Sequence, residues 1–148
     1  MVPRYLRLPV GGRIDRHGQE IEPFNAEDVK TALQEFKAES VEAIAVALIN
    51  SFLNPVHEQA CAELIRDLWD GDPDLISLSN EIMPIMGEYE RTSTTVVNAY
   101  LAPRVVPYLK DLNARLAEQG LERPFLLVQS NGGMTSVEHL SSRPVNLL

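Results

Sequence analysis

Residues 41–49 read VEAIAVALI, and only one of these side chains, Glu42, is charged. An apolar run of this length is typical of a strand buried on both faces, as in a parallel sheet. Asn54 and Pro55 follow as a helix cap and a first helical residue, and residues 71–73 end that helix. Residues 75–78 then form the next short strand. Strand, helix and strand at this spacing predict a right-handed βαβ unit. They therefore predict a mixed α/β fold with a largely parallel sheet and flanking helices.

Three elements are expected before this unit. Residues 6–10 alternate apolar and other side chains, which predicts a half-buried strand. Residues 13–21 follow, with a tight turn at His17 and Gly18, and predict a small antiparallel element. A helix is expected to begin at Asn25, its cap. The apolar stripe of this helix comprises Val29, Ala32, Leu33 and Phe36, and that of the helix after Pro55 comprises Cys61, Leu64, Ile65 and Leu68.

The stretch from Glu81 to Gly120 is harder to assign. The β-branched side chains of residues 92–97 lower helix propensity, so local chemistry leaves helix and strand open there. From Pro103 onward, apolar side chains repeat at helical spacing as far as Gly120, a natural helix cap. Pro107 lies early in that helix, so we expect a kink or a short break near Ala102.

The C-terminal part contains three further predicted features. Residues 125–128 predict a short buried strand, which runs into the turn QSNGG at residues 129–133. Thr135 and Glu138, three residues apart, have the spacing of a capping box that opens a helix. Residues 145–148, VNLL, are apolar with no turn or polar cap after them, which we interpret as a boundary inside a strand.

Composition bears on which partners are expected. The chain has 148 residues, 45% of them hydrophobic and 23% charged, which is ordinary for one soluble globular domain. A formal charge of -8 argues against nucleic acid, because phosphate binding needs a basic face. No apolar run reaches the roughly 18 residues that cross a bilayer. Cys61 is the only cysteine, which fits a reducing cytoplasm. We therefore expect a cytoplasmic protein with neither nucleic acid nor membrane as partner.

The turn at residues 129–133 is the first candidate site. It lies after an expected strand and before an expected helix, where open α/β sheets place ligands and helix amides face anions. Its candidate cofactor-binding residues are Ser130, Asn131, Gly132 and Gly133. The alternative is that the two glycines only permit a sharp turn.

Residues 88–94 are the second candidate site, because they are dense in hydroxyl groups and charge. They would contact a substrate or lie at an interface between lobes, and the candidates are Glu88, Arg91, Thr92, Ser93 and Thr94. The alternative is a solvated helix start, in which glutamates favour the helix dipole and hydroxyl groups bond locally.

Other chemistry-bearing patterns are weaker. His57 and Cys61 are four residues apart on an expected helix, a spacing that can present two metal ligands on one face. No second pair completes a tetrahedral site and Cys61 lies on the apolar stripe, so we expect a buried thiol and no metal. Neither a GxxxxGK[ST] loop, nor GxGxxG after a strand, nor GxSxG occurs. The residues alone therefore assign no catalytic group.

Three stretches resemble the hydantoinase A/5-oxoprolinase family, which includes N-methylhydantoinase. They are residues 41–58, residues 89–103, and residues 129–133 followed by 143–148. The resemblance implies the fold of the actin/sugar-kinase/Hsp70 ATPases, with a partial ribonuclease-H-like lobe and the start of a second lobe. Residues 92–97 would then be helical, because tertiary packing outweighs their low propensity. Residues 1–80 would end the N-terminal lobe, and residues 81–148 would hold the inter-lobe helices and begin the core lobe.

The resemblance also implies a reaction. ATP, with Mg²⁺, would phosphorylate a carbonyl oxygen of a cyclic amide, which water then opens. In the related acetone and acetophenone carboxylases, the activated carbon forms a carbon–carbon bond instead. A hydantoinase B-type subunit or domain is the implied partner.

The superfamily's two phosphate loops would lie before Met1 and beyond Leu148. We therefore expect an internal fragment that holds no nucleotide tightly and is inactive alone. We also expect it to self-associate through uncovered apolar surface, which light scattering would detect. The rival hypothesis is a stand-alone interaction module that kept the fold and lost the chemistry.

Overall fold

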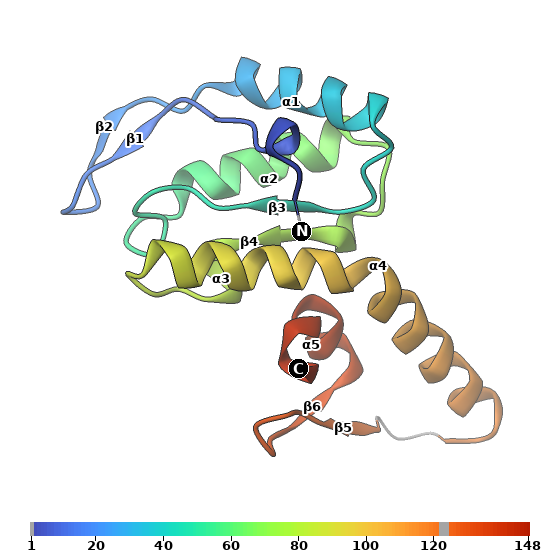
Figure 1. Cartoon of the computed structure of the whole chain (residues 1–148). Coiled ribbons are helices and arrows are strands. Elements are labelled where there is room, and N and C mark those ends of the chain that lie inside the picture. The colour runs from blue at the N-terminus through green and yellow to red at the C-terminus, as the bar shows by residue number, and fades with distance from the viewer. Residues whose placement is uncertain (1, 122–124) are drawn as a thin grey trace.

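The computed structural model describes residues 2–121 and 125–148. These residues form a mixed α/β fold, which confirms the predicted class (Figure 1). Within the described residues the strands form three two-stranded sheets, of which one is parallel and two are antiparallel. The parallel pair is the part of the fold that the apolar run at residues 41–49 predicts.

The predicted βαβ unit is confirmed. Strand β3 (Ile44–Val46) pairs in parallel with β4 (Ile76–Leu78), and helix α2 (Val56–Leu68) connects them. The side chain of Asn54 accepts a hydrogen bond from the Val56 amide (3.1 Å) at the start of α2, but Pro55 occupies the cap position and Val56 is the first helical residue, each one residue later than predicted. β3 is shorter than the apolar run because only its central residues pair with β4. A short 3₁₀ turn, η2 (Pro73–Leu75), leads into β4, and helix α3 (Ser79–Ile82) follows it.

Helix α1 (Ala26–Ala38) completes the first hydrophobic core. The Asn25 side chain accepts from the Glu27 amide (3.1 Å), which confirms the predicted cap. Figure 1 shows α1, α2, β3 and β4 following one another across the molecule, with the first half of α4 beside β4. The buried residues of this core are Val29, Leu33, Ile44, Val46, Cys61, Ala62, Ile65 and Leu78.

Leu68 does not belong to that core, although the helical spacing places it on the apolar stripe. Its side chain is 51% exposed. Leu68 is the last residue of α2, and the next residue, Trp69, packs against the core instead. The stripe prediction is therefore wrong at its final position, because the helix ends where the stripe would continue.

The N-terminal segment contains one wrong and one confirmed prediction. Residues 6–10 do not form a strand, because no described segment pairs with them; a 3₁₀ turn, η1 (Arg4–Leu6), precedes them. The antiparallel element is present as β1 (Arg13–Ile14) and β2 (Glu20–Glu22). Its turn is held by the Asp15 carboxylate, which accepts from the amides of His17 and Gln19 (both 2.8 Å). These bonds, with Gln19 as the largest cause, lower the pKa of Asp15 below its ordinary value.

Helix α4 (Glu88–Glu118) is one continuous element of 31 residues. It includes residues 92–97, which settles the open choice between helix and strand in favour of the helix. Burial of Thr95, Asn98 and Ala102 on its inner face explains how packing outweighs low propensity. Pro103 and Pro107 lie inside the helix, and Figure 1 shows its two halves running in different directions. The change of direction agrees with the predicted kink, since each proline removes one helical hydrogen bond.

The C-terminal part folds as a hairpin followed by a short helix. Strand β5 (Leu126–Val128) pairs antiparallel with β6 (Met134–Ser136). The prediction of a buried strand that leads directly to a helix is therefore wrong. Among the described strands, β5 pairs with β6 alone, and the side chains of Leu126 and Val128 are 56% and 65% exposed. Leu109 of α4, with Val137 and Leu140, forms the second core cluster.

Helix α5 (Val137–Ser142) begins one residue later than the capping box predicts. Ser136 is its cap, and its hydroxyl oxygen accepts from the His139 amide (3.3 Å). Thr135 belongs to β6 instead. The last residues form a 3₁₀ turn, η3 (Pro144–Leu147), so the interpretation of this end as part of a strand is wrong. Pro144 is buried there, which seats the turn against the rest of the chain.

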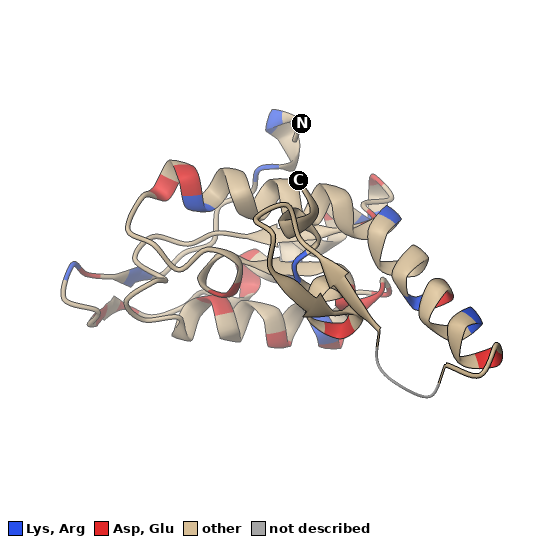
Figure 2. Ribbon diagram, turned by 90° about the horizontal axis from the view of Figure 1, so that it is seen from below, with Lys and Arg blue, Asp and Glu red and all other residues tan. Residues whose placement is uncertain are grey.

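Charged side chains are spread over the elements. Figure 2 shows acidic and basic residues interspersed along the second half of α4. Arg115 pairs there with Asp111 (2.9 Å), and Lys110 reaches Asp74 of η2 (2.6 Å). No helix among the described residues is both long and apolar enough to cross a membrane.

Candidate functional site

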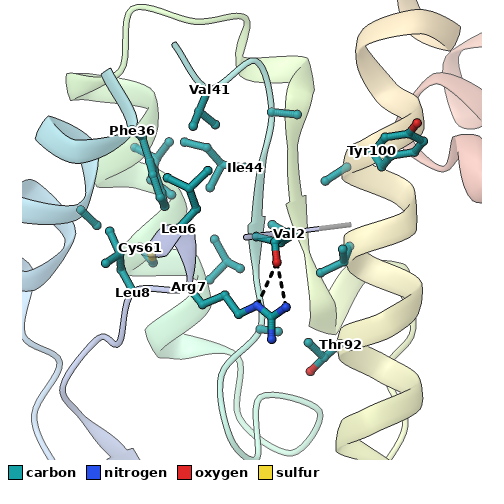
Figure 3. A pocket seen from close by; sticks show the side chains of 18 of the residues that line it. Val2, Leu6, Arg7, Leu8, Phe36, Val41, Ile44, Cys61, Thr92 and Tyr100 are labelled. Atoms are coloured by element: carbon teal, nitrogen blue, oxygen red, sulfur yellow. Dashed lines mark hydrogen bonds between the residues drawn. The ribbon is translucent and has the colours of Figure 1, made fainter. Parts of the chain in front are cut away.

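An open groove of about 1410 Å³ lies between the N-terminal segment, α1, β3 and α4 (Figure 3). Most of the side chains that line it are apolar, and one wall is the first half of α4. Figure 3 shows Thr92 and Tyr100 on this wall, and Leu6, Phe36 and Val41 on the opposite side. The groove is therefore a largely apolar surface, with polar groups on α4 and also at Arg7 and Glu42.

The second candidate stretch divides between this groove and the interior. Glu88, Thr92 and Ser93 line the groove, so the structure brings these three candidates together. Thr94 is half-buried and does not line it, and Arg91 is buried on the other side of the helix. The helix period explains the division, because each residue is turned by about 100° from the last, so positions 91 and 94 point away from the face that positions 92, 96 and 100 share.

Arg91 fastens α4 to the carboxyl ends of the two parallel strands. Only 1% of its surface is exposed. Its guanidinium donates to the Leu48 carbonyl beyond β3 (3.0 Å), to the Ser79 hydroxyl beyond β4 (3.1 Å) and to the Ile85 carbonyl (2.8 Å). The guanidinium also lies over the Phe52 ring, 5.5 Å from its centre. Arg91 is thus a buried residue with every contact inside the chain, and it does not face the groove.

Glu58 completes this arrangement from α2, and the sequence offered no sign of it. The residue is fully buried. One carboxylate oxygen accepts from the Leu48 amide (2.8 Å) and the Ser79 hydroxyl (2.6 Å), and the other accepts from the Asn80 amide (2.9 Å). A glutamate in the first turn of a helix is usually an exposed partner of the helix dipole, so spacing alone could not identify a buried one.

Glu58, Ser79 and Arg91 together form what we call the strand-end cluster. It occupies the carboxyl ends of parallel strands, where open α/β sheets commonly place ligands. Here the chain's own side chains fill that position. Among the buried side-chain atoms of the described residues, Asn80 Oδ1 is the one without a hydrogen-bond partner. The cluster is therefore suited to holding elements together rather than to binding an anion.

The first candidate site lies at the tip of the β5–β6 hairpin. Three of its amides are bonded within the chain: Ser130 to the Asn146 carbonyl (3.2 Å), Gly132 to the Gln129 carbonyl (2.9 Å) and Gly133 to Asn131 Oδ1 (2.8 Å). Gly132 has a φ of 83°, which favours glycine. The expected position at a helix N-terminus is wrong, because β6 intervenes before α5. The side chains of Ser130 and Asn131 are engaged within the chain too, because the Ser130 hydroxyl donates to the Asn146 carbonyl (3.3 Å) and Asn131 Oδ1 accepts the Gly133 amide.

His57 and Cys61 do not face a common ligand. His57 Nε2 lies 2.7 Å from Glu20 Oε1 of β2, and its ring packs on Phe24, whereas Cys61 is buried in the first core. Among the described residues, no group of three His, Cys, Asp or Glu side chains could hold a metal ion. Burial, and secondarily the charge of Glu58, raises the pKa of the Cys61 thiol to about 12.

We expect Cys61 to be unreactive in the folded chain. At about pH 8, a disulfide reagent should modify it on the order of 100-fold more slowly than in the chain unfolded by denaturant, because the thiolate is the reactive form. The ordinary pKa of the thiol is 9.0, so below that pH the thiol is protonated in both the folded and the unfolded chain. Cys61 therefore gives the free energy of unfolding no pH dependence there. Its contribution is lost as the pH rises from 9.0 toward about 12. Absorbance of the released thiol measures the rate, and equal rates in both states would show that Cys61 is accessible.

Two family patterns match the chain. Residues 1–69 match the hydantoinase/oxoprolinase N-terminal region, and residues 91–148 match hydantoinase/oxoprolinase. The chain belongs to the hydantoinase/oxoprolinase family. This membership confirms the resemblance carried by residues 41–58 and 89–103. The division of the chain near residue 80 stays a prediction.

Relatives within the hydantoinase/oxoprolinase family include subunits of two kinds of enzyme. The chain is 38% identical to the caprolactamase subunit alpha of Pseudomonas jessenii, covering 100% of this chain and 21% of the relative. It is 33% identical to the acetophenone carboxylase gamma subunit of Aromatoleum aromaticum, covering 93% and 19% respectively. The crystal structure of the ATP-dependent caprolactamase from Pseudomonas jessenii matches 98% of this chain and 21% of that one. The TM-score is 0.84 and the sequence identity 35%. The chain thus spans about a fifth of the length of its relatives.

Proposed function

We propose that these residues are a structural part of an ATP-dependent cyclic amide hydrolase, which activates the amide carbonyl by phosphorylation. The observation that carries the proposal is the match of 98% of the chain, at a TM-score of 0.84, to a protein described as an ATP-dependent caprolactamase. A lactam is a cyclic amide, and phosphorylating its carbonyl oxygen would make the carbon susceptible to attack by water. Cytoplasmic location belongs to the same proposal and agrees with a single, buried free thiol.

We propose further that the described residues do not by themselves cradle ATP and Mg²⁺. The amides of Ser130, Gly132 and Gly133 are engaged in bonds within the chain, and the strand ends are filled by the strand-end cluster. In the described parts of the chain, no three His, Cys, Asp or Glu side chains are grouped so that they could hold a metal ion. We therefore assign the phosphate-binding loops to other parts of the parent protein. Any ligand contact from Ser130 or Asn131 would have to share the bonds that these side chains already make within the chain.

In this proposal, the role of the strand-end cluster is to hold α4 at a fixed angle to β3 and β4. Phosphoryl transfer depends on positioning the nucleotide against the acceptor, and a displacement of about 1 Å can cost on the order of 100-fold in rate. Arg91 and Glu58 both bind Ser79, and they also bind the same residue, Leu48, Arg91 at its carbonyl and Glu58 at its amide. The cluster would thereby keep two lobes in register.

A carboxylase subunit is the second candidate function, favoured by the 33% identity to an acetophenone carboxylase subunit. Both candidates need ATP and an activated carbonyl, and they differ in whether water or a carbon nucleophile completes the reaction. Purified parent enzyme with ATP should be offered caprolactam, hydantoins and 5-oxoproline in one series. In a second series it should be offered acetone and acetophenone with bicarbonate. Turnover in the first series alone would support the hydrolase.

A partner subunit is part of the proposal. The relative with 38% identity is named as an alpha subunit, which supports a second subunit, and we propose one of the hydantoinase B type. The exposed side chains of Tyr89 and Tyr100 on the groove wall offer apolar surface that an assembly would cover. The same open surface is the reason to expect self-association of the isolated chain.

The 148 residues expressed alone are expected to hydrolyse ATP no faster than buffer, because they cradle neither phosphates nor metal. Phosphate release with ATP and Mg²⁺ measures this, and the parent enzyme purified in the same way is the positive control. Clear turnover by the 148 residues, or tight binding of ATP to them in calorimetry, would overturn the proposal that other parts of the parent protein supply the phosphate-binding loops. Inactivity of the parent enzyme with every substrate would instead favour an interaction module.

A further inference from the structure

One buried amide in the middle of α4 bonds three separate elements. Asn98 is 2% exposed. Its Nδ2 donates to the Ser77 hydroxyl of β4 (3.0 Å) and to the Ser142 carbonyl at the end of α5 (3.4 Å). Its Oδ1 accepts from the Val145 amide in η3 (3.1 Å). The residue therefore joins the parallel sheet to the C-terminal segment through α4.

The partners of Asn98 fix the orientation of its side-chain amide. The Val145 amide can only donate and the Ser142 carbonyl can only accept, so only one orientation of the Asn98 amide satisfies both. Asparagine is not a favoured residue in a helix interior, and its side chain often bonds back to its own helix. In this chain all three bonds of Asn98 go to other elements.

The bonds of Asn98 continue to the tip of the β5–β6 hairpin. Val145 is followed by Asn146, whose carbonyl accepts both the Ser130 amide (3.2 Å) and the Ser130 hydroxyl (3.3 Å). The hairpin itself is a two-stranded sheet, an arrangement of marginal stability without outside support. The segment at residues 145–146 therefore supplies support that the hairpin tip would otherwise lack.

We propose that Asn98 is a positioning residue for the turn at residues 130–133. It holds η3 against β4, and η3 holds Ser130, so the turn takes its place relative to the parallel sheet from one side chain in α4. The importance of this turn for a ligand rests on the proposed function, whereas the positioning itself does not. Asn98 touches no reacting group in this scheme.

The test compares isosteric variants by NMR of the 148-residue chain without nucleotide. Asn98→Leu removes all three bonds, and Asn98→Asp keeps the acceptor for the Val145 amide. In Asn98→Leu we expect hydrogen exchange of the Val145 and Ser130 amides to quicken about tenfold and the Gly132 and Gly133 resonances to shift. In Asn98→Asp, the oxygen that replaces Nδ2 faces the Ser142 carbonyl, which only accepts, so we expect exchange at Val145 and Ser130 to quicken as well. Asn113→Leu, the same replacement at an exposed position of α4, is the matched control and should change none of these signals.

Two results would overturn the proposal. One is a folded Asn98→Leu chain in which the Val145 and Ser130 amides keep their protection. The other needs no variant, so it applies even if Asn98→Leu fails to fold. In the unchanged chain, a Val145 amide that exchanges as fast as an unstructured peptide would show that its bond to Asn98 is not formed. Because no nucleotide is used, failure here is distinct from failure of the ATP-dependent function, which the phosphate-release assay tests.

Discussion

Replacing Arg91 with methionine is expected to lower the free energy of unfolding by about 3–5 kcal/mol, the usual cost of removing one partner from a buried ionic cluster. Methionine fills most of the arginine volume but cannot donate to the carbonyls of Leu48 and Ile85 or to the Ser79 hydroxyl. The Glu58 carboxylate would remain buried without the guanidinium that shares Ser79 with it. Loss of several bonds at one point explains why a single substitution should have so large an effect.

Denaturant unfolding followed by circular dichroism measures this effect. Arg104→Met is the matched control, because Arg104 is exposed on the same helix. The control should change stability by no more than about 0.5 kcal/mol. Arg91→Lys should fall between the two, since an ammonium group keeps the charge and loses the planar fork of donors. Equal unfolding midpoints for Arg91→Met and Arg104→Met would show that the strand-end cluster does not stabilise the fold.

Replacing Ile65 with alanine is expected to cost about 2–5 kcal/mol, because it opens a cavity in the first core. Ile65 is buried in α2 and belongs to the cluster that includes Val29, Val46 and Leu78. All four main elements of the βαβ half contribute to that cluster, so the loss should weaken the whole half rather than α2 alone.

Leu68→Ala is the matched control for Ile65→Ala, because it removes an exposed apolar side chain from the same helix. Leu68 lies three residues after Ile65 on the apolar stripe, yet its side chain is 51% exposed. We expect its replacement to change the free energy of unfolding by no more than about 0.5 kcal/mol. Both variants are compared in denaturant unfolding, with the slope of the transition as a check on two-state behaviour. Similar losses for the two would mean that Leu68 is buried in solution.

Sequence patterns predicted the parts of the fold that depend on near neighbours. Asn25 caps α1, and the Asn54 side chain bonds the first amide of α2; each accepts an amide two residues onward, a contact that local sequence completes. The apolar run around Ile44 and Val46 predicted a strand buried on both faces, and the spacing to residues 75–78 predicted its parallel partner. The prolines of α4 predicted its kink for the same local reason, since each lacks an amide hydrogen.

Sequence patterns failed where a partner decides the structure. Residues 6–10 have the alternation of a strand, but a strand needs a neighbour to pair with, and none of the described segments pairs with them. The turn at residues 129–133 was expected to precede a helix, and the pairing of β5 with β6 makes it a hairpin tip instead. Hydropathy records a side chain's preference for burial and carries no information about which segment will cover it.

The sequence alone therefore determined the βαβ unit, the cap of α1 and the family to which the chain belongs, because these follow from local bonding and from motifs in order. Only the tertiary structure decided which polar residues are buried. Arg91 bonds Leu48 across 43 positions, and Asn98 bonds Val145 across 47. A charged or amide side chain is stable in the interior only when its partners are present. Folding, and not spacing along the chain, brings those partners together.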